Sequence, residues 1–234
     1  MDFEQMEISF RQQLIVAMGQ TNLKDWQSPL DVPNLDRPQK RPANLPGDGK
    51  TAAVLALFCE QRNNGKPDGS TIKADLLLTQ RALNLSNHAG QISFPGGRLE
   101  PGESTEQAAI RETEEEIGIQ ESQIEIFGQL KSVYIPPSDF TVTPYVGWIR
   151  GLPKFKRCQR EVERIIRAPL NYLMDPQAVT SGTVTRSNGT THKVPCYQIG
   201  SHQVWGATAM MVGELVERLR RAEKALAGSA SQEK

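Results

Sequence analysis

A glycine-rich turn that leads directly into an acidic helix is the feature that most restricts how this 234-residue chain can fold. Residues 97–119 read GRLEPGESTEQAAIRETEEEIGI. Ser104 and Gln107 have the spacing of a capping box, which predicts where the helix begins. Gly118 follows the last periodic residue and predicts a left-handed stop. The segment is therefore expected to be a loop followed by a helix with defined ends.

The two faces of this helix differ in chemistry. At about 100° per residue, Glu112, Glu115 and Glu116 share one face. The stripe expected to pack on a sheet recurs every four residues, at Ala109, Thr113 and Ile117. Like charges four residues apart repel by about 0.2–0.5 kcal/mol on an exposed helix. A hard cation such as Mg²⁺ reverses that sign, because it is held by carboxylates and phosphate oxygens. The alternative interpretation is a solvated acidic surface.

The spacing of the fixed residues resembles the Nudix box, the signature of the Nudix hydrolase family. Gly97 is followed after five residues by Glu103, and after seven more by the run 111–119, RETEEEIGI. Every fixed position is filled, and Thr113 is the one departure, at a position that is usually aliphatic. A match of this length is far more specific than a lone glycine motif. The resemblance implies an α/β fold, a Nudix-type α/β/α sandwich with a mixed β-sheet.

The resemblance also implies roles for single residues. The metal ligands, for Mg²⁺ or Mn²⁺, would be Glu112, Glu115 and Glu116 with the carbonyl of Gly97. Glu103 and Arg111 would form the pair that locks the loop to the helix, and Arg111 is counted with the catalytic residues. Glu115 is the nearer candidate for the general base. Glu161 and Glu163 are outside candidates that we expect on an ordinary solvated face.

The segment before the box resembles the additional signature of the coenzyme A diphosphatase branch. Residues 77–97 read LLTQRALNLSNHAGQISFPGG, and the branch pattern continues through a second Arg to Phe-Pro-Gly-Gly. Ser86 stands where that second Arg is expected. Ser offers a neutral hydroxyl in place of a guanidinium that could clamp a phosphate. The residues that the resemblance assigns to substrate binding are Arg81, Phe94, Gly96 and Gly97.

These motifs predict a metal-dependent hydrolase that splits the diphosphate of coenzyme A or acyl-coenzyme A. The expected products are 3′,5′-ADP and a 4′-phosphopantetheine. The alternative, favoured by Ser86, is a Nudix hydrolase of another nucleoside diphosphate derivative, of the ADP-ribose or dinucleotide type. A domain that only binds a nucleotide is a third hypothesis. It is disfavoured because such domains usually lose a helix glutamate, and none is lost here.

Composition excludes several other classes of protein. The 27 basic and 27 acidic residues give zero net charge, so no global field draws the chain to nucleic acid or an anionic membrane. The three cysteines lack metal-ligand spacing, and their odd number without a secretory leader favours a reducing compartment. The three histidines lack such spacing too. We therefore expect a cytoplasmic enzyme, monomeric or homodimeric, that binds a small-molecule substrate and no nucleic acid or membrane.

The chain divides into four expected segments: a helical extension over residues 1–27, a Pro-rich connector over 28–50, the Nudix hydrolase domain over 51–226 and a flexible tail over 227–234. The extension would pack on the domain or on a partner subunit. Strands are expected at Ala52–Phe58, Ala74–Thr79, Ile124–Tyr134 and Thr141–Ile149. A strand with a short helical turn, a hairpin and a long amphipathic helix should follow, at Val162–Leu173, Val184–Gln198 and residues 207–226. Trp205, before that helix, would pack in the domain or stack on adenine.

Overall fold

The computed structural model describes residues 3–19, 40–43, 45, 47–61, 74–84, 89–150, 153–185 and 189–232. Its helices are α1 Phe3–Gly19, α2 Thr105–Ile117, α3 Leu170–Met174 and α4 Gly206–Gln232, with 3₁₀ turns at Glu121–Gln123 and Pro136–Ser138. Its strands are β1 Lys50–Glu60, β2 Ala74–Arg81, β3 Ile92–Ser93, β4 Gly96–Arg98, β5 Ile124–Gln129, β6 Val133–Ile135, β7 Phe140–Ile149, β8 Val162–Pro169, β9 Val179–Thr185, β10 Thr191–Ile199 and β11 His202–Trp205. Most of the expected connector over residues 28–50 lies outside the described residues.

Eight of the strands form one mixed sheet. β1 lies in its interior and pairs in parallel with β7 along most of its length. On its other side β1 pairs antiparallel with β4 near its start and with β2 near its end. β8 pairs with the outer side of β2, while β5 and β6 pair with β7. β1 is buried over most of its length, as its apolar run AAVLALF predicts for a strand covered on both faces.

The segment Phe94–Gly97 crosses from β2 to β1 inside this sheet. β3 pairs with the end of β2, and β4 pairs with Ala52–Val54 of β1. Gly96 has a φ of +146°, and a Cβ at this position would lie 2.3 Å from the carbonyl oxygen of Ala53. A backbone approach this close requires glycine.

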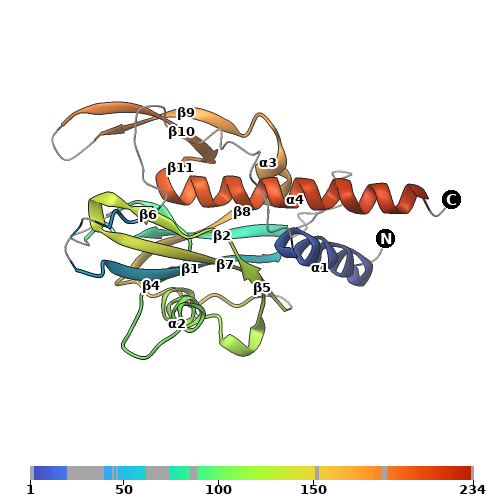
Figure 1. Ribbon diagram of the computed structural model, residues 1–234, viewed down its shortest axis with the longest axis horizontal. Coiled ribbons are helices and arrows are strands. Elements are labelled where there is room, and N and C mark those ends of the chain that lie inside the picture. The colour runs from blue at the N-terminus through green and yellow to red at the C-terminus, as the bar shows by residue number, and fades with distance from the viewer. Residues whose placement is uncertain are drawn as a thin grey trace.

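Helices cover both faces of the sheet (Figure 1), which confirms the α/β/α arrangement with a mixed sheet. Below the sheet in that view, α2 packs on β1 through a core that includes Leu55, Leu57 and Ile117. On the other face a larger core joins the sheet to α1, α3, α4 and the remaining strands. α2 is thus held on its own side of the sheet, away from both terminal helices.

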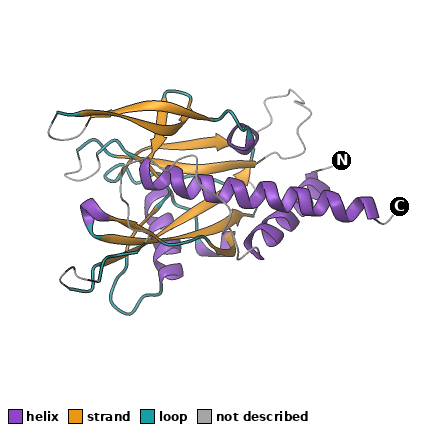
Figure 2. Cartoon of the chain, turned by 45° about the horizontal axis from the view of Figure 1, so that its top comes forward, coloured by secondary structure: helices purple, strands orange, loops and turns teal. Residues whose placement is uncertain are grey.

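α1 packs on the domain. Phe10, Leu14 and Ala17 are buried, and the ring of Phe10 makes edge contacts with Phe58 and Trp148. Gln13 donates a hydrogen bond from Nε2 to the carbonyl of Leu219 on α4, at 3.1 Å. Figure 2 shows α1 beside the C-terminal part of α4. The sequence had left open whether this helix docks on the domain or on a partner, and these contacts hold it on the domain.

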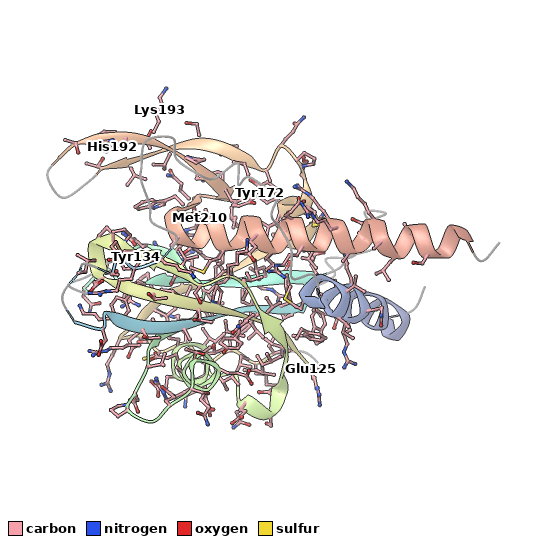
Figure 3. The ribbon with its side chains drawn as sticks, viewed as in Figure 1. Glu125, Tyr134, Tyr172, His192, Lys193 and Met210 are labelled. Atoms are coloured by element: carbon pink, nitrogen blue, oxygen red, sulfur yellow. The ribbon has the colours of Figure 1, made fainter. Side chains whose placement is uncertain are left out.

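A salt bridge also joins α1 to β5. Arg11 donates from Nη2 to both carboxylate oxygens of Glu125 on β5, at 2.6 and 2.7 Å. Glu125 is labelled in Figure 3, close to α1. Arg11 remains partly exposed, so this pair contributes little to stability compared with the apolar contacts of the helix.

A second, three-stranded sheet contacts the first half of α4. β10 lies between β9 and β11, and α4 contacts both β10 and β11. The predicted hairpin Val184–Gln198 is therefore longer, because its first strand begins at Val179 and a third strand follows. His192 and Lys193 are exposed near its tip, as Figure 3 shows. Trp205 ends β11 and is half-buried.

Two other elements differ from their predicted bounds. The predicted strand Ile124–Tyr134 is interrupted, because a bulge at Gly128 shifts the register and Lys131 donates its amide to Glu214 of α4 in place of a strand partner. α4 continues through Gln232, beyond the predicted end at residue 226. Two further alanines in that stretch, Ala227 and Ala230, have the highest helix propensity of any residue. No helix in the described ranges is both long and apolar enough to span a bilayer.

Candidate active site and metal centre

The box helix has both of its predicted caps. Ser104 accepts a hydrogen bond from the amide of Gln107 at 3.2 Å, and the Gln107 side chain accepts from the amide of Ser104 at 2.9 Å. Gly118 ends the helix in the left-handed conformation, with a φ of +75°. The packing stripe is buried as predicted, and the Thr113 hydroxyl donates to the carbonyl of Ala109 at 2.6 Å. This internal bond satisfies the hydroxyl at the position that is usually aliphatic.

Arg111 ties the loop to the helix. Its Nε and Nη2 donate to the two carboxylate oxygens of Glu103, at 2.8 and 3.1 Å, and Nη2 also donates to the carbonyl of Arg98 at 3.1 Å. Such a two-pronged pair fixes orientation as well as distance. The guanidinium lowers the pKa of Glu103, chiefly through these hydrogen bonds. The remaining nitrogen of Arg111 donates to Glu112 at 3.0 Å and to Glu115 at 3.4 Å.

Glu112 lies directly against the glycine turn. A Cβ at Gly97 would come within 2.5 Å of a Glu112 carboxylate oxygen, so any side chain here would displace that carboxylate. Burial raises the pKa of Glu112, an effect that its bond from Arg111 opposes. The Glu112 carboxylate thus lies beside Gly97, whose carbonyl is the further oxygen ligand predicted from the sequence.

Glu116 is the most deeply buried carboxylate of the box. The residue is 3% exposed, and its Oε2 atom has no hydrogen-bond partner among the described residues. Burial raises the pKa of Glu116 to about 8, with the Arg81 charge lowering it and the Glu112 and Glu161 charges raising it. Arg81, at the end of β2, also has a buried and unpartnered Nε within the described structure.

Glu161 joins this group, contrary to the expectation that it sits on a solvated face. One carboxylate oxygen each of Glu112, Glu116 and Glu161 lies within 4.8 Å of the other two. Glu161 directly precedes β8 and is half-buried, whereas Glu163, two residues along that strand, is exposed. Because β8 is far from the helix in sequence, no local periodicity could bring Glu161 to the box.

The other predicted site residues occupy different positions around this group. Glu115 is outside it, and its side chain is 55% exposed and paired with Arg111. Phe94 is 1% exposed and packs in the core on the α4 face, where it anchors the turn. Gly96 lies in the turn between β3 and β4, and its backbone interacts with the Glu116 carboxylate. Ser86 lies outside the described residues.

These residues fit a hard divalent cation. Oxygen donors are the ligands that such cations prefer. Three carboxylates this close repel one another without a positive partner, and Arg81 beside Glu116 and Arg111 beside Glu112 supply two positive charges against three negative ones. A bound cation would satisfy the buried Oε2 of Glu116, which has no hydrogen-bond partner among the described residues.

Comparison with known proteins identifies the family. Residues 50–166 match the NUDIX domain, a range that contains the box, the preceding signature and Glu161. The chain belongs to the Nudix family. It is 36% identical over 159 residues to Nudix hydrolase 3 of Caenorhabditis elegans, covering 62% of this chain and 66% of that protein, just under two thirds. It is 32% identical over 181 residues to the uncharacterized Nudix hydrolase NudL of Photorhabdus laumondii, covering 76% of this chain and 90% of NudL.

Among solved structures, the Nudix hydrolase RenU of Mycobacterium smegmatis has a TM-score of 0.47 at 18% identity, over 75% of this chain and 86% of RenU. The family match and the two relatives above show that the protein is a Nudix hydrolase, an enzyme. Nudix hydrolases use divalent metal ions, in agreement with the oxygen-rich group on α2.

Proposed function

We propose that this Nudix hydrolase cleaves the diphosphate of coenzyme A or acyl-coenzyme A, with Mg²⁺ or Mn²⁺ as its ion. The observation that carries the proposal is the signature over residues 77–97 together with its place in the fold. That segment runs from β2 through β3 into β4, so its first arginine and its last glycine both adjoin the carboxylates of α2. A substrate held by this segment would present its diphosphate to Glu112 and Glu116.

The box residues and the glycine turn would have separate roles in hydrolysis. Glu112 and Glu116 would hold the ion, and the carbonyl of Gly97 is the further oxygen predicted for it. A bound divalent ion neutralises diphosphate oxygens and lowers the pKa of water beside it. The Arg111–Glu103 pair keeps the glycine turn and the carboxylate helix in one fixed arrangement.

Two further side chains would act on substrate and water. Arg81 would attract the anionic substrate, because its Nε is unpartnered in the described structure and its charge faces Glu116. Glu115 would accept the proton from the attacking water, since its carboxylate is exposed to solvent on the same helix. In this scheme the backbone of Gly96 and Gly97 lets phosphate approach closely, and Phe94 supports the turn from the core.

The second candidate is hydrolysis of ADP-ribose or a dinucleotide, and Ser86 favours it. Coenzyme A carries a 3′-phosphate besides its diphosphate, so the missing arginine removes a cation that could have bound it. If Ser86 sets this preference, S86R should raise turnover of coenzyme A relative to its dephospho form. Unchanged relative turnover of coenzyme A in S86R would show that the residue at position 86 does not set the substrate preference.

A substrate panel tests the proposal. Coenzyme A, acetyl-coenzyme A, dephospho-coenzyme A and ADP-ribose would each be incubated with Mg²⁺ or Mn²⁺, and products separated by chromatography. We expect 3′,5′-ADP from coenzyme A, with a higher kcat/KM than for ADP-ribose. E116Q should lose at least 100-fold in kcat. A higher kcat/KM for ADP-ribose would contradict the coenzyme A assignment, and full activity of E116Q would contradict the ion site.

A further inference from the structure

A short basic segment leads into β8. Residues 154–160 read KFKRCQR, with four basic residues and no acidic one, in a chain whose net charge is zero. All four are exposed, and none forms an ion pair with another described residue. They are Lys154, Lys156, Arg157 and Arg160. Cations gathered in this way without carboxylate partners favour an anionic ligand.

Contacts with α2 hold the basic segment in place. The side chain of Phe155 packs against the core on the α2 face. The amide of Lys156 donates to the carbonyl of Ile117 at 2.9 Å. The amide of Cys158 donates to the carbonyl of Glu116, also at 2.9 Å. The segment is therefore fixed against the C-terminal end of the box helix.

A turn brings the end of the basic segment to the candidate metal centre. The amide of Glu161 donates to the carbonyl of Cys158 at 3.2 Å, and Arg160 lies within this turn. One oxygen each of Glu112, Glu116 and Glu161 lies within 4.8 Å of the other two, and these form the three-carboxylate group. Consecutive Cα atoms are about 3.8 Å apart, so the side chain of Arg160 starts beside a member of that group.

Arg157 is held across the same turn. Its Nη1 donates to the carbonyl of Val162, the first residue of β8. A guanidinium has further N–H donors in a planar fork that matches phosphate oxygens. Two arginines thus belong to one backbone turn beside the three-carboxylate group, and one of them is anchored by a hydrogen bond.

The dipole of α2 offers a simpler reason for cations in this region, because positive side chains are favoured near a helix C-terminus. That effect is confined to the last turn, and it accounts for Lys156, whose Cβ would lie 2.6 Å from a Cβ added at Gly118. It does not account for Arg160, which lies in the turn before β8. The two explanations differ in what they predict for substrates with and without an additional phosphate.

We propose that Arg157 and Arg160 bind a phosphate monoester of the substrate, separate from the diphosphate that is cleaved. This inference rests on the proposed function and specifies its substrate further. In coenzyme A the additional group is the 3′-phosphate, on the same ribose whose 5′ oxygen carries the diphosphate. The two arginines would supply the positive charge that Ser86 lacks at the position of the expected arginine.

The affinity for 3′,5′-ADP relative to 5′-AMP tests the site without turnover of any substrate. These nucleotides differ only in the 3′-phosphate, and calorimetry on the full-length protein with Mg²⁺ gives both dissociation constants. We expect wild type to bind 3′,5′-ADP about 10-fold more tightly, R160Q to lose most of this preference and R157Q/R160Q to lose all of it. The matched control R150Q removes an exposed arginine next to Glu125 and should keep the wild-type preference. Equal or undetectable affinities in wild type, or an unchanged preference in the double variant, would overturn the proposal.

Steady-state kinetics give a second comparison, between coenzyme A and dephospho-coenzyme A. In R160Q, kcat/KM should fall about 10-fold for coenzyme A and stay within about twofold for the dephospho form. R160K keeps the charge and should recover part of the loss. An equal fall for both substrates is what a general effect of charge on α2 predicts, and it would contradict a phosphate site.

Circular dichroism checks the fold of R160Q, which we expect to persist because the bonds of this turn are made by backbone atoms. The two proposals fail separately. If coenzyme A is not cleaved but the preference for 3′,5′-ADP depends on the two arginines, the coenzyme A assignment fails and the phosphate site stands. If coenzyme A is cleaved and that preference does not depend on them, the assignment stands and the phosphate site is wrong.

Discussion

At the scale of the residue, burial of Glu116 among other carboxylates has a measurable cost when no cation is present. Its pKa is raised to about 8 from 4.5, first by burial and then by the charges of Glu112 and Glu161. The folded protein therefore binds this proton more tightly than the unfolded chain does. Stability from this residue is complete below pH 4.5 and is lost as the pH rises toward 8.

In chelator, we thus expect the thermal midpoint of wild type to fall between pH 5 and 8, by the equivalent of a few kcal/mol at most. E116Q removes the titrating group, so the thermal midpoint of this variant should fall less over the same pH range. Saturating Mn²⁺ should flatten the wild-type curve, because the cation favours the ionised carboxylate. Parallel curves for wild type and E116Q in chelator would contradict the assigned environment of this side chain.

Arg111 is the other residue whose geometry makes a definite prediction. R111K keeps one positive charge but cannot make both hydrogen bonds to Glu103. We expect kcat to fall about 10–100-fold and the free energy of unfolding to fall by about 1–2 kcal/mol, because hydrogen bonds to charged groups contribute on this scale. Steady-state kinetics and urea unfolding measure the two effects. Wild-type kcat in R111K would show that the two-pronged contact does not position the site.

At the scale of the element, the sequence predicts what depends on neighbours along the chain. The capping box at Ser104, the stop at Gly118 and the buried stripe of α2 follow from local spacing, and all three are present. Glu161 depends on the pairing of β2 with β8, so nothing near it in sequence distinguished it from Glu163. The break after Gly128 likewise depends on a side chain of α4, about eighty residues away.

Gly118 connects the end of α2 to the segment that carries Glu161. Its φ is +75°, and an added Cβ would meet the side-chain Cβ of Lys156 at 2.6 Å and its backbone at 3.0 Å. G118A should therefore lower the free energy of unfolding by about 2–4 kcal/mol and weaken Mn²⁺ binding, because the displaced segment continues to Cys158 and Glu161.

Gly102 supplies the matched control. It has a similar φ of +84°, but a Cβ there meets nothing within 4 Å. G102A should thus show the backbone cost alone, about 1–2 kcal/mol, without the loss of Mn²⁺ affinity. Chemical denaturation and calorimetry of both variants make the comparison. Equal effects in the two variants would mean that contact with Lys156 is unimportant.

At the scale of the whole molecule, the sheet lies between the larger hydrophobic core and the helix that carries the candidate active site. The active-site helix and the segment around Cys158 lie on one face, with a core of their own. α1 and α4 lie on the other face, in the larger core. Amphipathic spacing predicted that α1 is a helix, but its docking site is built from residues throughout the chain and could not be read from that spacing.

This division predicts that core damage on the α1 face lowers stability without altering catalysis in the folded protein. Phe10 is 5% exposed and contacts Phe58 and Trp148, so F10A should lower the free energy of unfolding by about 3–5 kcal/mol through lost burial and a cavity. I15A, on the same helix, should cost less than about 1 kcal/mol, because Ile15 is 54% exposed. Denaturant unfolding gives both values, and kinetics well below the midpoint should give wild-type kcat for both variants. A tenfold drop in kcat for folded F10A would show that α1 reaches the active site through the sheet, because no contact on the α2 face would have been removed.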